Sequence, residues 1–165
     1  MKLNTKIKSI DLISSKDKIH FNSEGTFPIN YGNNFIDDNE QIHFYSEIEI
    51  IERKLTLSID VNFKYKRNCG RCLTNSNNDD KSTSLITLNL NEENDYEIIY
   101  DDEYYDLSPF ISEMIIEKMD INYVCEQKCK GLCSFCGINL NKFSCNHKEK
   151  NLKESPFSSL SQLDL

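Results

Sequence analysis

The alternation of apolar and polar residues is most regular between residues 54 and 67. Every second residue from Leu55 to Tyr65 is apolar, and polar residues fill the positions between them. Because successive side chains of a strand point to opposite faces of a sheet, this period of two predicts a long strand with one buried face. Residues 42–51 are expected to form the preceding strand, with residues 52–53 as the turn of a hairpin.

The segments after the long strand are expected to complete an antiparallel sheet. Residues 74–81 are rich in Asn and Asp and predict a polar turn. Residues 82–90 alternate again and are expected to return antiparallel to the long strand. The acidic stretch 91–106 is expected to hold one more strand, whose apolar residues are Tyr96, Ile98 and Tyr100.

The first 41 residues have a weaker pattern. Residues 18–30 form a short apolar–polar stretch that ends in Gly25 and Pro28, and residues 31–41 predict a turn or loop. The first 21 residues lack the uninterrupted apolar core of a signal peptide, and no segment is apolar over the length that spans a bilayer. We therefore expect a cytoplasmic protein.

A helix is expected to open at Ser108 and to end near Asp120. Ser108 can act as the N-cap, and Pro109 suits the first helical position. Four apolar residues share one face at helical spacing, which is typical of a helix packed on a core. These residues are Leu107, Ile111, Met114 and Ile115.

Together these elements predict an α+β fold: a mainly antiparallel β-sheet body, one helix in the C-terminal half and a cysteine-rich segment. A chain of 165 residues suits one domain with a small appendage. The expected division is a body over residues 1–122, a zinc-binding segment over residues 123–150 packed on the body, and a tail over residues 151–165.

Seven cysteines and one histidine are spaced like metal ligands. A C-x-x-C pair follows the long strand, and a C-x-x-x-C pair, a C-x-x-C-Gly motif and a Cys-Asn-His motif follow the helix. Eight ligands suffice for two structural zinc sites, each with four nitrogen or sulfur ligands. The local set is Cys133, Cys136, Cys145 and His147, and the set that joins two distant segments is Cys69, Cys72, Cys125 and Cys129.

Other arrangements of these thiols stay open at the level of sequence. One zinc ion with spare thiols is the main alternative, and free buried cysteines are another. Iron could replace zinc in an all-thiolate set. Disulfides are disfavoured because the number of cysteines is odd and because no signal segment is expected.

We expect no enzymatic activity. A redox C-x-x-C pair lies at a helix N-terminus in a βαβ unit, whereas Cys69 follows an expected strand and no helix pattern begins at Cys72. A catalytic zinc needs an open coordination position, and two closed four-ligand sites would leave none. His20 and His43 lie in strand-like segments, where surface or half-buried roles are expected.

Basic residues gather around the proposed ligands, although the net charge is −8. Residues 61–73 hold four basic residues and no acid, and residues 125–150 hold five lysines and two glutamates, whereas residues 74–120 hold thirteen acids and two lysines. These basic residues could form a face for RNA, with the acidic block facing a basic protein. They could instead offset the charge of about −2 on a four-thiolate zinc site. The candidate RNA or partner contacts are Lys64, Lys66, Arg67, Arg71, Lys128, Lys130 and Lys142.

The order of these motifs resembles the bacterial YceD family of large ribosomal RNA subunit accumulation proteins. The resemblance rests on Cys-Gly-Arg-Cys-Leu at residues 69–73, on the helix opened by Asp106-Leu107, on the string CKGLCSFCGINLN at residues 129–141 and on a C-terminal Ser-Pro-Phe. One departure from the family pattern is the Cys-Asn-His motif at residues 145–147. The corresponding segment of many similar family members ends in C-x-C. An imidazole can replace a thiolate at zinc, so the site is compatible with this change.

The resemblance implies a role in the accumulation of large-subunit ribosomal RNA through ribosome assembly. It implies a ribosomal RNA, a ribosomal protein or a pre-ribosomal particle as the partner, and neither a membrane nor a small-molecule substrate. No catalytic activity is established for the family. The alternative function is a zinc-stabilised protein–protein adaptor that makes no direct contact with RNA.

Overall fold

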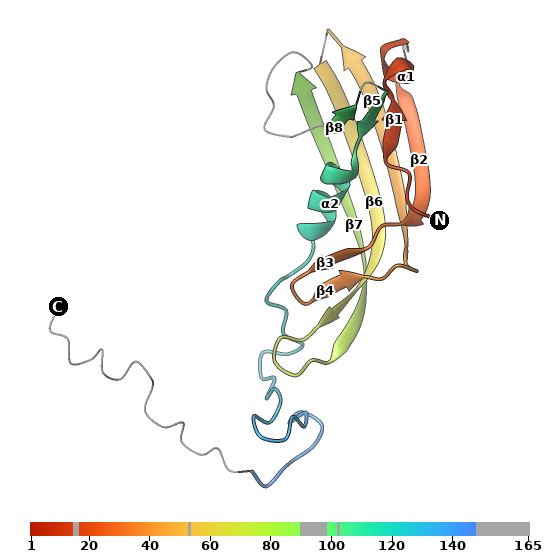
Figure 1. The fold of residues 1–165 in the computed structure, drawn as a ribbon. Coiled ribbons are helices and arrows are strands. Elements are labelled where there is room, and N and C mark those ends of the chain that lie inside the picture. Colours follow the sequence, from red (N-terminus) through yellow and green to blue (C-terminus); the bar gives the residue numbers. More distant parts are fainter. Residues whose placement is uncertain (15–16, 53, 90–98, 102, 148–165) are drawn as a thin grey trace, which may run out of the picture.

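The computed structural model describes residues 1–14, 17–52, 54–89, 99–101 and 103–147. Its largest element is a six-stranded antiparallel sheet in which β6 is central (Figure 1). The strand order is β2-β5-β6-β4-β3. β5 and β4 pair with different stretches of β6, and β7 pairs with β6 along its full length. The strands are β2 (Ile19–Thr26), β3 (Ile29–Tyr31), β4 (Asn34–Ile36), β5 (Gln41–Ile51), β6 (Lys54–Asn68) and β7 (Asn75–Asn89).

The alternating pattern of β6 sets the buried face of this sheet. All six apolar residues at its alternate positions from Leu55 to Tyr65 are buried, as the period of two predicts. β5 pairs with β6 from Ile51 opposite Lys54, so the predicted hairpin is confirmed. Its turn includes Glu52 at a φ of 49°.

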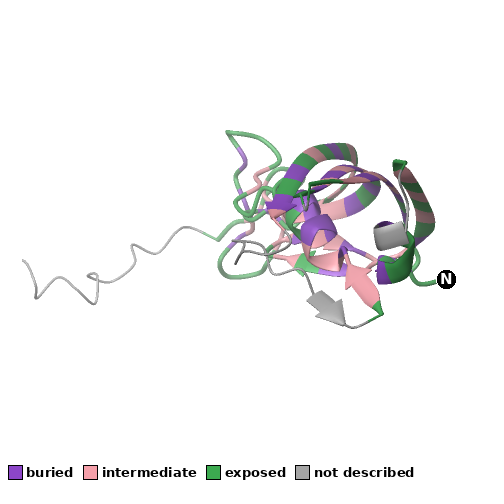
Figure 2. Ribbon diagram, turned by 90° about the horizontal axis from the view of Figure 1, so that it is seen from above, coloured by how far each residue is buried: buried purple, intermediate pink, exposed green. Residues whose placement is uncertain are grey.

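A smaller sheet and two helices cover the buried face. The small sheet has the order β1-β9-β8 and is antiparallel. Helix α2 packs on β6 and β7, and the large sheet curves around it in the view from above (Figure 2). The mainly antiparallel α+β class is therefore confirmed, while the short helix α1 was not predicted. These elements are β1 (Lys6–Lys8), α1 (Ser9–Ser14), β8 (Ile99–Asp101), β9 (Tyr104–Asp106) and α2 (Ser108–Ile116).

Two polar segments expected to be turns are strands instead. Residues 74–81 belong almost entirely to β7, which pairs with β6 along its full length from Asn75 opposite Asn68. Residues 31–41 include the β3–β4 hairpin, which turns at Gly32 with a φ of 59°. The first half of β7 has no buried face to produce an apolar period, and backbone pairing with β6 holds it in place. β3 and β4 bury Ile29 and Ile36, but strands of three residues are too short to show a period.

Helix α2 begins at Ser108 as predicted, but its N-cap and its end differ from the prediction. Its N-cap is Leu107 rather than Ser108, and it ends at Ile116 rather than near Asp120. The carboxylate of Asp106 accepts the Ser108 N–H (2.9 Å) and the Thr5 hydroxyl (2.7 Å). Burial opposes ionisation of Asp106, but these donors outweigh it and lower its pKa. The expected apolar stripe is buried, together with Phe110.

Where one strand was expected over residues 91–106, the described part, residues 99–101 and 103–106, holds two short strands. Tyr100 lies in β8, and β9 follows it as its antiparallel partner. Tyr96 and Ile98 lie outside the described residues, as does the tail expected at residues 151–165. In the part of the chain that the structure describes, no helix has both the length and the apolar character needed to cross a membrane.

The exit from α2 carries the chain to the far end of the large sheet. Asn34, a buried residue of β4, donates from Nδ2 to the carbonyl of Asp120 (3.0 Å) and to that of Tyr31 (3.2 Å). These bonds fasten the segment after α2 to the β3–β4 hairpin. The cysteine-rich segment therefore starts beside the β6–β7 turn (Figure 1).

Candidate metal centres

The C-x-x-C pair at residues 69–72 forms the turn between β6 and β7. The Cys69 N–H donates to the carbonyl of Thr74 (3.0 Å), and the Leu73 N–H donates to the carbonyl of Cys69 (2.9 Å). Leu73 adopts a φ of 56°, which reverses the chain after the second cysteine. Both sulfur atoms are thereby presented at the tip of the longest hairpin in the sheet.

Contacts of Tyr123 hold the later segment against this turn. The Gly70 N–H donates to the Tyr123 carbonyl at 2.9 Å. The Arg67 guanidinium lies 3.8 Å from the centre of the Tyr123 ring, in a cation–π contact. Cys125 follows two residues later, so its position next to the turn depends on these contacts.

The first group consists of Cys69, Cys72, Cys125 and Cys129, and their sulfur atoms all lie within 4.8 Å of one another. Two of the separations are 3.8 Å (Cys69–Cys129) and 3.6 Å (Cys72–Cys125). Sulfur atoms bound tetrahedrally at about 2.3 Å from zinc would lie about 3.8 Å apart. This group therefore has the donor set and the size for one tetrahedral metal ion.

Hydrogen bonds lower the pKa of the Cys69 thiol in the first group. Burial opposes its ionisation, but N–H groups of Cys125, Cys72 and Arg71 outweigh burial and lower the pKa of Cys69 to about 6. Lost solvation and the sulfur of Cys72 raise the pKa of Cys125 to about 12. Four neighbouring thiols cannot all ionise without a cation among them, which a metal ion would supply.

The second group consists of Cys133, Cys136, Cys145 and His147, whose ligand atoms also lie within 4.8 Å of one another. Nδ1 of His147 is 3.9 Å from the sulfur of Cys133, so the imidazole fits the place where C-x-C was expected. Backbone N–H groups of Cys136 and Phe135 lower the pKa of Cys133 to about 6, against the effect of burial. This group could hold a second metal ion.

A small hairpin within residues 131–140 shapes the second group. The Cys133 N–H donates to the carbonyl of Ile138 (2.8 Å), and the Gly137 N–H donates to that of Cys133 (2.9 Å). Gly131 and Gly137 adopt φ values of 74° and 69°, a region that favours glycine. These conformations let the hairpin close through its own backbone hydrogen bonds.

The two glycines give a matched test of this hairpin. A Cβ at Gly131 would lie 3.2 Å from the carbonyl oxygen of Arg71, whereas one at Gly137 would meet nothing within 4 Å. We expect Gly137→Ala to cost about 1–2 kcal/mol through backbone strain alone. Gly131→Ala should cost roughly 2–4 kcal/mol, because it also pushes the hairpin away from the β6–β7 turn. Thermal unfolding of both variants would measure the difference, and equal losses would contradict the contact.

The basic residues near the first group are held by other parts of the chain. Lys66 forms an ion pair with Asp37, and Arg67 covers Tyr123. Arg71 donates from Nη1 to the carbonyls of Gln127 (3.5 Å) and Cys129 (3.4 Å). By contrast, none of the ion pairs found among the described residues involves the exposed lysines of the cysteine-rich segment, which are Lys128, Lys130 and Lys142.

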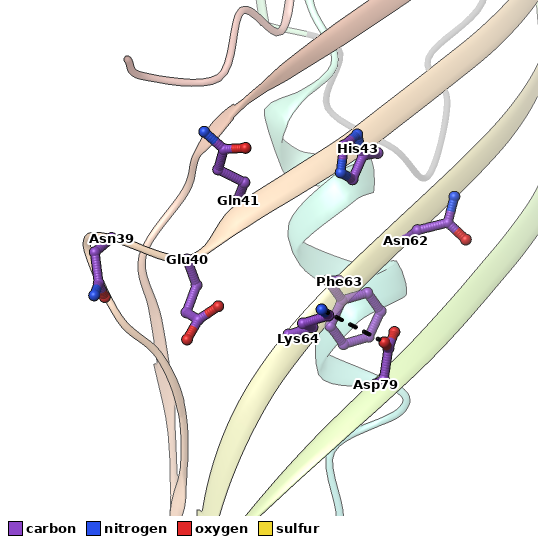
Figure 3. Close-up of a pocket in the computed structure, with 8 residues that line it drawn as sticks. All are labelled: Asn39, Glu40, Gln41, His43, Asn62, Phe63, Lys64 and Asp79. Carbon is purple, nitrogen blue, oxygen red and sulfur yellow. Dashed lines mark ion pairs between the residues drawn. The ribbon is translucent and has the colours of Figure 1, made fainter.

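Lys64 lies at a shallow hollow of about 460 Å³ on the outer face of the sheet (Figure 3). Its ammonium group is 4.0 Å from the carboxylate of Asp79, which faces it across β6 and β7. Glu40 lines the same hollow. The acidic and basic residues predicted to occupy separate faces are therefore interleaved here, which weakens Lys64 as a phosphate contact.

The antiparallel sheet and the two groups of ligand atoms define the class of this chain: a β-sheet protein with two sites that could hold metal ions. One site joins two distant segments, and the other is local. A family model described as "Large ribosomal RNA subunit accumulation protein YceD" matches residues 57–164, and the chain belongs to this family. The match runs from β6 through both cysteine groups.

Two plant proteins resemble the chain over parts of its length. Both are named "Large ribosomal RNA subunit accumulation protein YCED homolog 1, chloroplastic". The protein from Zea mays is 33% identical over 84 residues, which are 46% of this chain and 28% of the relative. The protein from Arabidopsis thaliana is 35% identical over 57 residues, which are 33% of this chain and 18% of the relative. The matches thus span less than a third of either relative, and no solved structure matches the chain.

Proposed function

We propose that this chain is a non-enzymatic zinc-binding protein that supports the accumulation of large-subunit ribosomal RNA during ribosome assembly. The observation that carries the proposal is that the family match covers the stretch containing both cysteine groups. Zinc suits both donor sets, and it supplies a rigid tetrahedral centre without redox chemistry. Its role here is to hold the cysteine-rich segment in one shape on the end of the sheet.

The surface that would meet RNA is the cysteine-rich segment. Its exposed lysines Lys128, Lys130 and Lys142 are available for phosphate groups. Phe135 and Phe143 are 56% and 62% exposed, and exposed aromatic rings stack with unpaired bases. A combination of free cations and exposed rings favours single-stranded RNA over a duplex as the bound form.

Depletion of the protein in cells should lower mature large ribosomal subunits relative to small ones. The measurement is a sedimentation profile of ribosomal particles, taken at normal temperature and under cold stress. A wild-type copy should restore the profile, and a copy with Lys128, Lys130 and Lys142 all changed to Ala should not. The matched control removes three exposed lysines elsewhere, Lys2, Lys8 and Lys54, and should restore it. A normal profile in depleted cells would contradict the assembly role.

Purified without chelator, the chain should hold about two zinc ions, because its eight ligands form two tetrahedral sets. Elemental analysis by mass spectrometry against protein concentration measures this ratio. A single ion would contradict the division into two sets. Iron in place of zinc would point to redox chemistry in the all-thiolate set.

A zinc-stabilised adaptor that contacts only proteins is the second candidate. The observation that favours it is that Lys66, Arg67 and Arg71 are already held by contacts within the chain. Crosslinking in living cells separates the two functions. Crosslinks from the cysteine-rich segment to ribosomal RNA support the first, whereas crosslinks to proteins alone support the second.

A further inference from the structure

Asn139 in the second group's hairpin and Asn141 just after it contact cysteines of the first group. Asn141 donates from Nδ2 to the sulfur of Cys129 at 3.2 Å. Asn139 donates from Nδ2 to the carbonyl of Cys72 at 3.4 Å. Neither asparagine belongs to a ligand set, and no role was predicted for either of them from the sequence.

Asn139 also acts on Cys72 through a hydroxyl group. Its Nδ2 donates to Oγ1 of Thr74 at 3.1 Å, and Oγ1 lies 3.2 Å from the sulfur of Cys72. The neutral Cys72 thiol donates to Oγ1. When Cys72 is a thiolate, the hydroxyl proton of Thr74 points to the sulfur instead, because Oγ1 still accepts from Asn139. Asn141 thus contacts the sulfur of Cys129 directly, and Asn139 is connected to the sulfur of Cys72 through Thr74.

The position of both side chains depends on the second group. The residue pair Leu132 and Asn139 forms an isolated antiparallel bridge across the hairpin. The Leu140 N–H donates to the carbonyl of Gly131 at 3.0 Å. Cys133 and Cys136 lie inside the stretch that these bonds close, so a metal ion on the second group would fix the loop that carries the asparagines.

We propose that Asn139 and Asn141 couple the two centres, so that metal bound at the second group tightens metal binding at the first. The inference rests on the proposed zinc binding. N–H donors aimed at a thiolate stabilise its negative charge, and outer partners of this kind are worth about 10–100-fold in metal affinity. Coupling of binding free energies is reciprocal, so metal at the first group tightens the second by the same factor.

A purely structural role for Asn141 makes a different prediction. Its Oδ1 accepts the Lys130 N–H at 2.8 Å, and its own N–H donates to Oδ1 of Asn139 at 2.9 Å. Asn141→Asp keeps the shape and the acceptor but replaces the donor toward Cys129 with an oxygen. If Asn141 only shapes the loop, this variant should bind metal like the wild type.

The test uses the full chain titrated with cobalt, with a chelator as competitor. Thiolate–cobalt absorption reports binding, and the d–d bands distinguish a four-sulfur site from a site with an imidazole. Asn141→Asp should weaken the four-sulfur site about 10–100-fold. Asn122→Ala, an exposed asparagine outside both groups, should leave it unchanged. Equal affinity in the wild type and in Asn141→Asp would overturn the proposal.

A double-mutant cycle isolates the coupling. Cys136→Ser, which empties the second group, should weaken the four-sulfur site by a similar factor in the wild type. In a chain with Asn139→Ala and Asn141→Ala it should weaken the site no further, because the connection is already cut. A full additional loss in that background would overturn the role of the asparagines.

A measurement on the unmodified sequence avoids any variant that fails to fold. In the chain loaded with an NMR-active cadmium isotope, the Nδ2 protons of Asn141 should show scalar coupling to cadmium through the sulfur of Cys129. Absence of this coupling in a fully loaded chain would overturn the direct bond. A wild-type chain that takes up neither cobalt nor cadmium would contradict the zinc-binding function as well.

Discussion

Cys69→Ser and Cys129→Ser should each remove the same single zinc ion and lower the melting temperature by similar amounts. Both residues belong to the first group, which joins the β6–β7 turn to the segment after α2. An ion held there closes a loop of about fifty residues, which is worth about 4 kcal/mol in a chain-entropy estimate. For a chain of this size the melting temperature should fall by roughly 10 °C.

The double variant distinguishes a shared site from two separate ones. Cys69→Ser combined with Cys129→Ser should be little worse than either change alone, because each already removes the whole site. Elemental analysis and thermal unfolding of the three proteins measure this, with the second group filled in each at saturating zinc. Unchanged zinc content in Cys69→Ser alongside a loss in Cys129→Ser would show that the β6–β7 turn supplies no ligands.

Cys136→Ser should remove the other ion and unfold only the region around it. The hairpin within residues 131–140 is closed by its own backbone bonds and by the second group. A site left with three ligands binds metal far more weakly, so the hairpin loses its main support. Hydrogen exchange should show lost protection over residues 131–143 and unchanged protection in β5, β6 and β7.

Cys136→Ser also tests whether the cysteine-rich segment unfolds independently of the large sheet. At saturating zinc the first group should stay filled, although with lower affinity if the asparagines couple the two sites. The melting transition of the sheet should therefore change little. Loss of protection throughout β6 would mean that the local site supports the whole fold, which would contradict the division between the two groups.

The sequence predicted the elements whose side chains carry a period. The long strand at residues 54–67 and the buried helix face were read correctly because one face of each is apolar and the other is polar. The first half of β7 and the β3–β4 hairpin were missed. The side chains in the first half of β7 are polar, and its structure depends on backbone pairing with β6. β3 and β4 contain apolar residues, but each strand is only three residues long, which is too short to show a period.

The candidate site divides in the same way. The ligand chemistry and the short spacings are local, so they were enough to predict which atoms could bind metal, and the second group lies entirely within residues 133–147. The spacings also suggested that Cys69 and Cys72 share a site with Cys125 and Cys129, but they left a single site with spare thiols as an alternative. The fold brings these four sulfur atoms together, through the full-length pairing of β6 with β7 and the tether at Asn34. It also showed that Arg67 and Arg71 make contacts within the chain, and that Asn139 and Asn141 reach the first group. Apart from the bond between Asn141 and Cys129, these contacts join residues more than fifty positions apart, and no local pattern encodes them.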